Sequence, residues 1–127
     1  MQGVRDYPNQ IDAGCVEAAL NSAFRGVRHN QYVAGGGEFP NGASVTQLTY
    51  AQTGDARGQA MFEVSNFSTG SRIVHSFTGM GGQLPQSAFP PALRAMVKAN
   101  DTISQRCHLD LRGIGLKAIG QHVNALE

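Results

Sequence analysis

The chain has 127 residues, a length that fits one domain with a modest hydrophobic core. Its formal net charge is only +1, and its 10 basic residues form no run, which argues against a nucleic-acid-binding protein. No apolar stretch approaches the ~20 residues that a membrane-spanning helix needs, so the sequence predicts no transmembrane segment.

The first elements in chain order are an extended arm and a helix. Residues 1–11 are polar and include Pro8, which is typical of an extended N-terminal arm. Asp12 can cap a helix over residues 13–24, because its carboxylate can accept hydrogen bonds from the free N–H groups of the first turn. Apolar residues recur at helical spacing along this segment, and Cys15 lies among them.

The middle of the chain has the alternating pattern of β-strands. Strands are predicted over residues 44–51, 59–67 and 72–78, and a weaker one over 27–33. The turns between the later strands are short, so neighbouring strands should form hairpins in an antiparallel β-meander of three to four strands. Alternation gives each strand one apolar face for the core and one more polar face.

The last part of the chain is predicted to be helical. A helix is expected over Pro91–Arg106, where proline is tolerated because the first turn leaves its N–H positions unpaired anyway. A weaker helix is expected over residues 110–123, which contain Gly113, Gly115 and Gly120. The fold class is therefore α+β, a single domain over residues 1–127 with an N-terminal helix and one or two C-terminal helices packed on one face of the sheet.

The chain has two cysteines, Cys15 and Cys107. Both fall on the apolar stripes of predicted helices that can pack together, so we predict a structural disulfide between them. The alternative is a pair of reduced cysteines that act as small core residues, as is common in cytosolic proteins.

The segment Cys-Val-Glu-Ala-Ala-Leu at residues 15–20, a following sheet and a late helix that ends in Arg106-Cys107 resemble small uncharacterised exported or lipid-anchored proteins of Gram-negative bacteria. This resemblance implies the helix-sheet-helix fold and a periplasmic or outer-membrane-anchored location, and it implies no activity. The first eight residues lack a signal peptide. The final pair Leu126-Glu127 matches a common cloning remnant, so we expect that an export signal was removed from the expressed protein.

No catalytic, metal or cofactor motif stands out, and we predict none. The histidines are isolated from one another and from the cysteines, apart from Cys107-His108, whose side chains diverge on a helix. The alternative is a small thiol- or histidine-dependent enzyme. In that case Cys15, activated by the start of its helix, would be approached by His29 or His75.

The more polar face of the sheet is a candidate binding surface. Its predicted residues are Gln47, Thr49, Glu63, Ser65, Arg72 and Ser76. An ordinary solvated sheet face would have the same pattern. The glycine-rich segment 35–42 and the segment 79–91 are further candidates, because long loops often carry recognition. The sequence favours a non-enzymatic exported domain that binds an envelope protein or a cell-wall component, with an inhibitor or immunity protein as a special case.

Overall fold

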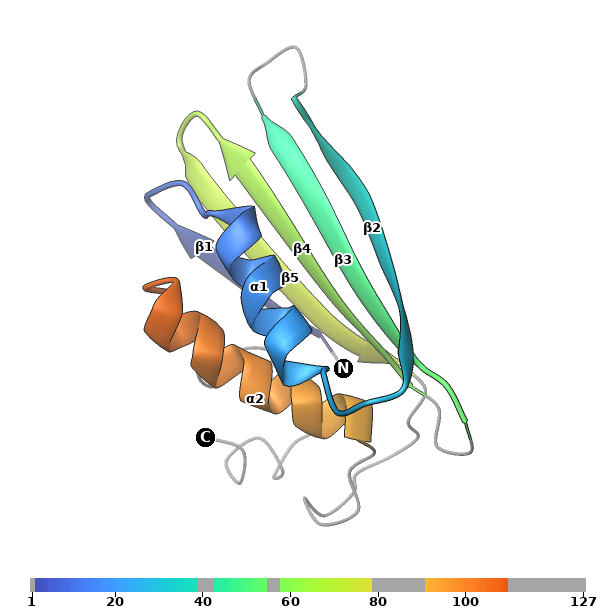
Figure 1. The fold of residues 1–127 in the computed structure, drawn as a ribbon. Coiled ribbons are helices and arrows are strands. Elements are labelled where there is room, and N and C mark those ends of the chain that lie inside the picture. The colour runs from blue at the N-terminus through green and yellow to red at the C-terminus, as the bar shows by residue number, and fades with distance from the viewer. Residues whose placement is uncertain (1, 39–42, 55–57, 79–90, 110–127) are drawn as a thin grey trace.

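The fold consists of one antiparallel sheet covered on one face by two helices. The computed structural model describes residues 2–38, 43–54, 58–78 and 91–109. In chain order the elements are β1 (Gln2–Tyr7), α1 (Ala13–Ala23), β2 (His29–Glu38), β3 (Ser44–Gln52), β4 (Gln59–Phe67), β5 (Gly70–Thr78) and α2 (Pro91–Arg106). The α+β class predicted from the sequence is confirmed (Figure 1).

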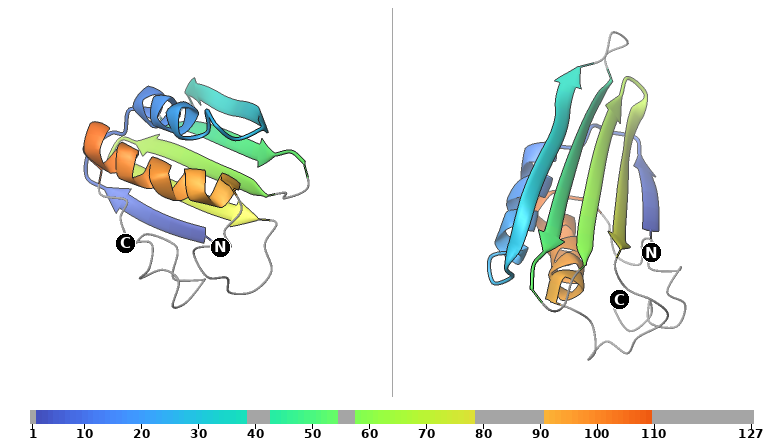
Figure 2. Two further views of the ribbon diagram at one scale, coloured as in Figure 1. Left: turned by 60° about the horizontal axis from the view of Figure 1, so that its bottom comes forward. Right: turned by 90° about the vertical axis from the view of Figure 1, so that its right-hand side faces the viewer.

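The five described strands lie in the order β1-β5-β4-β3-β2, and all neighbouring pairs are antiparallel. Strands β2 to β5 form the predicted meander, whereas β1 pairs along the far side of β5. The chain then crosses the sheet through α1 and enters β2 at the opposite edge (Figure 2). Two strands, β1 and β2, therefore form the edges of the described sheet.

The sheet has more strands than the three to four predicted. Residues 2–7, expected to belong to the extended arm, form β1, whose partner β5 lies about 70 residues away in the sequence. Such a distant pairing leaves no turn signal beside the strand. Strand β2 also continues to Glu38, through a glycine-rich stretch that we expected to be a loop. The weak helix expected over residues 110–123 and the final pair 126–127 lie outside the described residues.

Helix α1 begins where the sequence predicts. The carboxylate of Asp12 accepts hydrogen bonds from the backbone N–H groups of Gly14 and Cys15, at 2.9 and 3.3 Å. Helix α2 is stabilised differently at its start, because the backbone N–H of Ala92 donates to the side-chain oxygen of Gln52 at 2.8 Å. Gln52 ends β3, so this bond attaches the first turn of α2 to the sheet.

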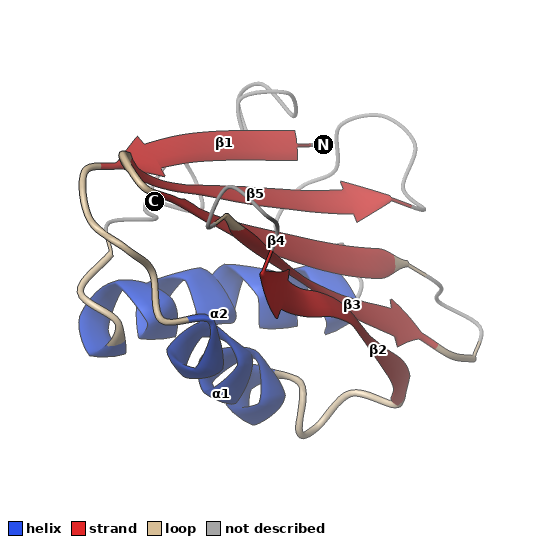
Figure 3. Ribbon diagram, turned by 90° about the horizontal axis from the view of Figure 1, so that it is seen from above, coloured by secondary structure: helices blue, strands red, loops and turns tan. Residues whose placement is uncertain are grey.

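The hydrophobic core lies between the sheet and the two helices. Side chains from α1 and α2 pack against alternate residues of β3, β4 and β5, and Figure 3 shows both helices on the same side of the sheet. The largest buried side chains are Leu20, Phe24, Leu48, Tyr50, Phe62, Ile73, His75, Leu93, Met96 and Ile103. The opposite face of the sheet carries no helix among the described residues.

No helix in the described part of the chain is long and apolar enough to cross a membrane.

Candidate functional site

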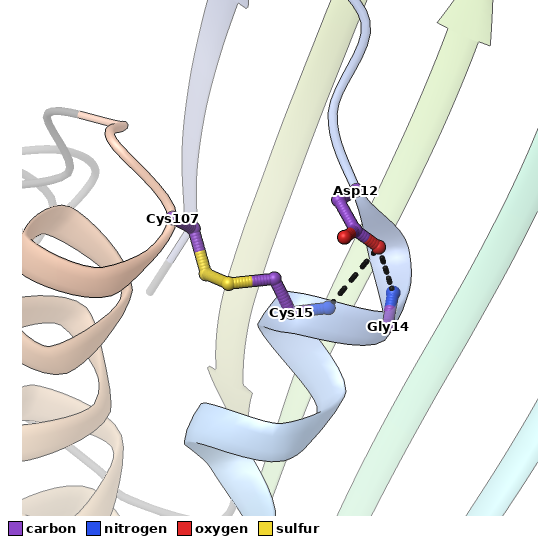
Figure 4. Close-up of a disulfide and its surroundings, with 4 residues drawn as sticks. All are labelled: Asp12, Gly14, Cys15 and Cys107. Carbon is purple, nitrogen blue, oxygen red and sulfur yellow. Dashed lines mark hydrogen bonds between the residues drawn. A yellow bond between two sulfur atoms is a disulfide. The ribbon is translucent and has the colours of Figure 1, made fainter.

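The predicted disulfide is present. Cys15 in the first turn of α1 and Cys107, which follows α2, are joined by an S–S bond with their Cα atoms 5.9 Å apart (Figure 4). Because Asp12 caps the same turn, the bond fixes a well-ordered helix start to the end of the second helix. This bond joins the two members of the helical layer.

The sheet face opposite the helices is the candidate binding surface, and we call it the open face. Its side chains alternate along each strand with the buried core residues, as the exposure of β3, β4 and β5 shows. All six residues predicted from the sequence lie there. The described side chains of the open face are Val4, Asp6, Asn30, Tyr32, Ala34, Val45, Gln47, Thr49, Ala51, Gln59, Met61, Glu63, Ser65, Phe67, Arg72, Val74, Ser76 and Thr78.

Backbone register arranges this open face in rows that run across the strands. One row passes from Tyr32 through Thr49 and Met61 to Ser76. The neighbouring row passes from Ala34 through Gln47, Glu63 and Val74 to Val4. Residues opposite one another on adjacent antiparallel strands have Cβ atoms about 5 Å apart, so the side chains of a row form a continuous surface.

The centre of the open face holds a hydrogen-bonded pair. The side-chain amide of Gln47 donates to the carboxylate of Glu63 at 3.1 Å. Both residues are partly exposed. Together with the neighbouring hydroxyl of Thr49, the pair offers both hydrogen-bond donors and acceptors.

A second polar pair lies toward the β1 edge. The guanidinium of Arg72 donates to both carboxylate oxygens of Asp6, at 2.7 and 3.2 Å. The hydrogen bond from Arg72 lowers the pKa of Asp6, and the same bond raises the pKa of Arg72. Since the two charges compensate each other, Glu63 is the one charged group of the described open face without an opposite charge paired to it.

Ser65 lies on the open face but is only 6% exposed. It is opposite Val45 on one side and Arg72 on the other, and both of these side chains are larger. Of the six predicted residues, Ser65 is therefore the least able to touch a partner.

Sequence reasoning missed the residues of this surface that belong to the two edge strands. Val4 and Asp6 belong to β1, which we did not predict, and Tyr32 belongs to a strand with poor alternation. Tyr32 is 58% exposed and Val4 is 49% exposed. No period-2 pattern marks β1, because residues 4–7 are apolar, polar, polar and apolar in turn, so the sequence offered no signal for this strand.

The groups considered for catalysis are occupied by other contacts. The sulfur of Cys15 is in the disulfide and is not a free thiol. The ring of His75 is 2% exposed, packs against Phe62, and has its Nδ1 3.2 Å from the side-chain oxygen of Asn100. The ring of His29 packs against Phe24 and Tyr50, with its Nδ1 2.6 Å from the carbonyl of Val27.

Two other predictions are resolved only in part. The segment 35–42 begins inside β2, and residues 39–42 lie outside the described part. Of the segment 79–91, only Pro91 is described, as the first residue of α2. Among the described residues, no group of three or more His, Cys, Asp or Glu side chains is placed to hold a metal ion.

Comparisons with protein-family models, with curated protein sequences and with solved structures find no significant match for this chain. The open face must therefore be interpreted from its own chemistry. That chemistry is hydroxyl, amide and apolar groups on a broad surface with little net charge.

Proposed function

We propose that this protein is a non-enzymatic binding domain of the bacterial envelope, and that its open face holds an envelope protein or a cell-wall component. The observation that carries the proposal is the convergence of the predicted polar residues on the face of the sheet that neither described helix covers, where Gln47, Thr49 and Glu63 are adjacent. The disulfide supports the location, because such bonds persist in oxidising compartments such as the periplasm.

The composition of the open face suits recognition of an uncharged polar partner. Its donors and acceptors are mostly hydroxyl and amide groups, and apolar side chains such as Met61 and Val74 lie between them. Polar groups set the specificity of a binding surface, while apolar area supplies affinity on burial. An inhibitor or immunity protein that binds a cell-wall hydrolase is one member of this class.

Site-specific photocrosslinking tests the proposal. A benzophenone amino acid is placed at Thr49 on the open face and, as a matched control, at Lys98 on the exposed side of α2. Each protein is then irradiated in an envelope fraction of the source bacterium, and adducts are identified by mass spectrometry. We expect a discrete adduct from position 49 and none from position 98.

A second pair of variants checks that the open face itself makes the contact. Gln47→Ala combined with Glu63→Ala should reduce the adduct yield by at least about tenfold, since each lost polar contact to a partner costs on the order of 1 kcal/mol. Arg94→Ala on α2 should leave the adduct yield unchanged. Equal adducts from positions 49 and 98, or none from either, would refute the proposal.

A further inference from the structure

Strand β2 leaves one of its two sides without a neighbouring strand in the described sheet, where it pairs only with β3. The six consecutive residues 30–35 of this strand are all exposed. Tyr32 on the open face is 58% exposed, and Val33 on the helix side is 54% exposed. Among the described residues, neither the helical layer nor another strand covers this part of β2, so both its faces and its outer edge are accessible there.

Two backbone hydrogen bonds show which residues direct their polar groups outward. The N–H of Thr53 donates to the carbonyl of Arg28 at 3.0 Å, and the N–H of Gln52 donates away from β2, to Gly58, at 2.8 Å. Because N–H and C=O groups alternate in direction along a strand, residues 30, 32 and 34 face β3. The N–H and C=O groups of Gln31, Val33 and Gly35 therefore point to the outer edge.

This edge lacks the features that usually prevent strand pairing. Residues 29–37 contain no Asp, Glu, Lys, Arg or Pro, and the bulge between Gly35 and Glu38 begins only after the exposed stretch. The other edge strand, β1, is different, because it carries Arg5 and Asp6 within its six residues. Of the two edges, β2 is thus the one open to another strand.

We propose that β2 is a dimerisation edge, which pairs antiparallel with β2 of a second copy of this chain. A two-fold axis perpendicular to the sheet makes the strand its own antiparallel partner, so one edge supplies both sides of the contact. The axis passes at Tyr32. Gln31 then lies opposite Val33 of the partner subunit, and these outward-facing residues exchange the ladder hydrogen bonds.

A second copy fits this edge for two reasons. The exposed stretch carries no charge, so two identical strands meet without like-charge repulsion. In addition, the strand exposes one large apolar side chain on each face, and the two-fold axis brings Tyr32 opposite Tyr32 of the partner subunit and Val33 diagonal to Val33 of the partner subunit. An unrelated peptide would have to supply apolar groups on both faces at this spacing.

The same symmetry limits the register to axes centred on a residue, and an axis at Tyr32 brings this 58% exposed side chain opposite its own copy. Side chains directly opposite one another must lie on the same face of a continuous sheet, so the two opposed residue numbers must differ by an even number. With the axis at Tyr32, Asn30 lies opposite Ala34 of the partner subunit. The paired stretch is short, so we expect it to bury less than the ~1,600 Å² of a standard interface and to associate mainly at high protein concentration.

Cysteine crosslinking tests the pairing and its register. In Tyr32→Cys the two new thiols are opposite each other at the axis, within disulfide reach. In Asn30→Cys, the matched control on the same face of the same strand, each thiol faces Ala34 of the partner subunit. After mild oxidation, with the native disulfide verified by peptide mapping, we expect a covalent dimer from the first variant at least about tenfold faster than from the second. Equal rates would indicate random collision and overturn the proposal.

Edge variants test the contact without added thiols. Val33→Pro removes an outward N–H that β3 does not use, and Val33→Lys places charges near the axis. Val4→Lys on the opposite edge is the control. We expect the wild type and Val4→Lys to show a concentration-dependent mass increase by light scattering up to about 1 mM, and Val33→Lys to remain monomeric. If Val33→Pro does not fold, Val33→Lys decides the result alone.

A monomeric wild type at that concentration, or dimers that persist in Val33→Lys, would overturn the proposal. A dimer of this kind would place two open faces on the same side of one ten-stranded sheet, twice the five strands of the described chain. Joint binding of a partner by the two open faces rests on the proposed function, whereas the strand pairing itself does not. Loss of the crosslink from Thr49 with the dimer intact would remove the function and leave the edge proposal standing.

Discussion

The disulfide between Cys15 and Cys107 joins two residues 92 positions apart and ties the start of α1 to the end of α2. The two helices also pack side by side on the sheet (Figure 1). The bond therefore closes a loop that includes β2 to β5 and both helices. In the unfolded chain the same bond restricts most of the polypeptide.

Removal of this bond should destabilise the domain strongly. A closed loop of this length is worth about 4 to 5 kcal/mol in the chain-entropy account of disulfide stabilisation. We expect Cys15→Ala with Cys107→Ala to lower the free energy of unfolding by about that amount, as measured by urea denaturation.

Reduction provides the control for the same experiment. A reducing agent should destabilise the wild type to the level of the double variant, and it should not affect the double variant itself. A loss of less than about 1 kcal/mol in both cases would show that the reduced, unfolded chain is already restricted by other means.

Asn66 fixes the connection between β1 and α1 to the sheet. Its side-chain oxygen accepts from the N–H of Ile11 at 2.8 Å, and its amide donates to the carbonyl of Ile11 at 2.9 Å. Ile11 is only 4% exposed, so loss of these bonds leaves its backbone groups poorly solvated. We expect Asn66→Ala to cost about 1 to 3 kcal/mol of stability.

Asn30→Ala is the matched control for Asn66→Ala, because Asn30 is an exposed strand residue of the same type. Its effect should stay within about 0.5 kcal/mol. Thermal unfolding followed by circular dichroism compares the two variants. Equal shifts in Tm would show that the bonds to Ile11 contribute nothing.

Gly70 begins β5 at a place where no side chain fits. Its φ is +148°, and a Cβ atom there would lie 2.4 Å from the carbonyl oxygen of Tyr7 in β1. Gly70→Ala should therefore displace β1 from β5 and destabilise the domain by more than about 1 kcal/mol. Gly26→Ala should be neutral or slightly stabilising, because a Cβ at Gly26 meets nothing within 4 Å. Urea midpoints of the two variants test this contrast.

The elements predicted well from the sequence are those specified by local patterns. Helix α2 begins at Pro91 and ends at Arg106 as expected, and β4 has the predicted bounds Gln59–Phe67. Helical spacing also placed Cys15 and Cys107 correctly enough to predict their bond. In each case a period of 3.6 or 2 residues, with a proline or a turn at its boundary, carries the information.

The features that were missed depend on distant neighbours. Strand β1 exists because Gln2 to Tyr7 find partners on β5, which nothing near them in the sequence indicates. The burial of Ser65 on an otherwise accessible face depends on Val45 and Arg72 in the flanking strands. The exposed edge of β2 likewise follows from strand order, which places it last in the sheet.

Tyr50 makes the stability of the domain sensitive to alkaline pH. Its side chain is fully buried, stacks on Phe24 at a centroid distance of 4.6 Å, and donates a hydrogen bond to the side-chain oxygen of Asn21 at 2.6 Å. Burial raises the pKa of Tyr50 well above its ordinary value, and the negative charge of Glu17 raises it further. The folded state therefore holds the neutral phenol at a pH where the unfolded chain has released the proton.

The sign of the effect follows from this difference. A group whose pKa is higher in the folded state contributes its full stabilisation below the unfolded value of about 10, and that contribution is lost as pH rises above it. Between about pH 10 and pH 11 the wild type should lose about 1 kcal/mol more stability than Tyr50→Phe, which has no phenol to ionise. Urea denaturation of both proteins at each pH measures the difference, and other titrating groups cancel because both chains share them. Parallel losses in the two proteins would show that Tyr50 does not control the alkaline limit of the fold.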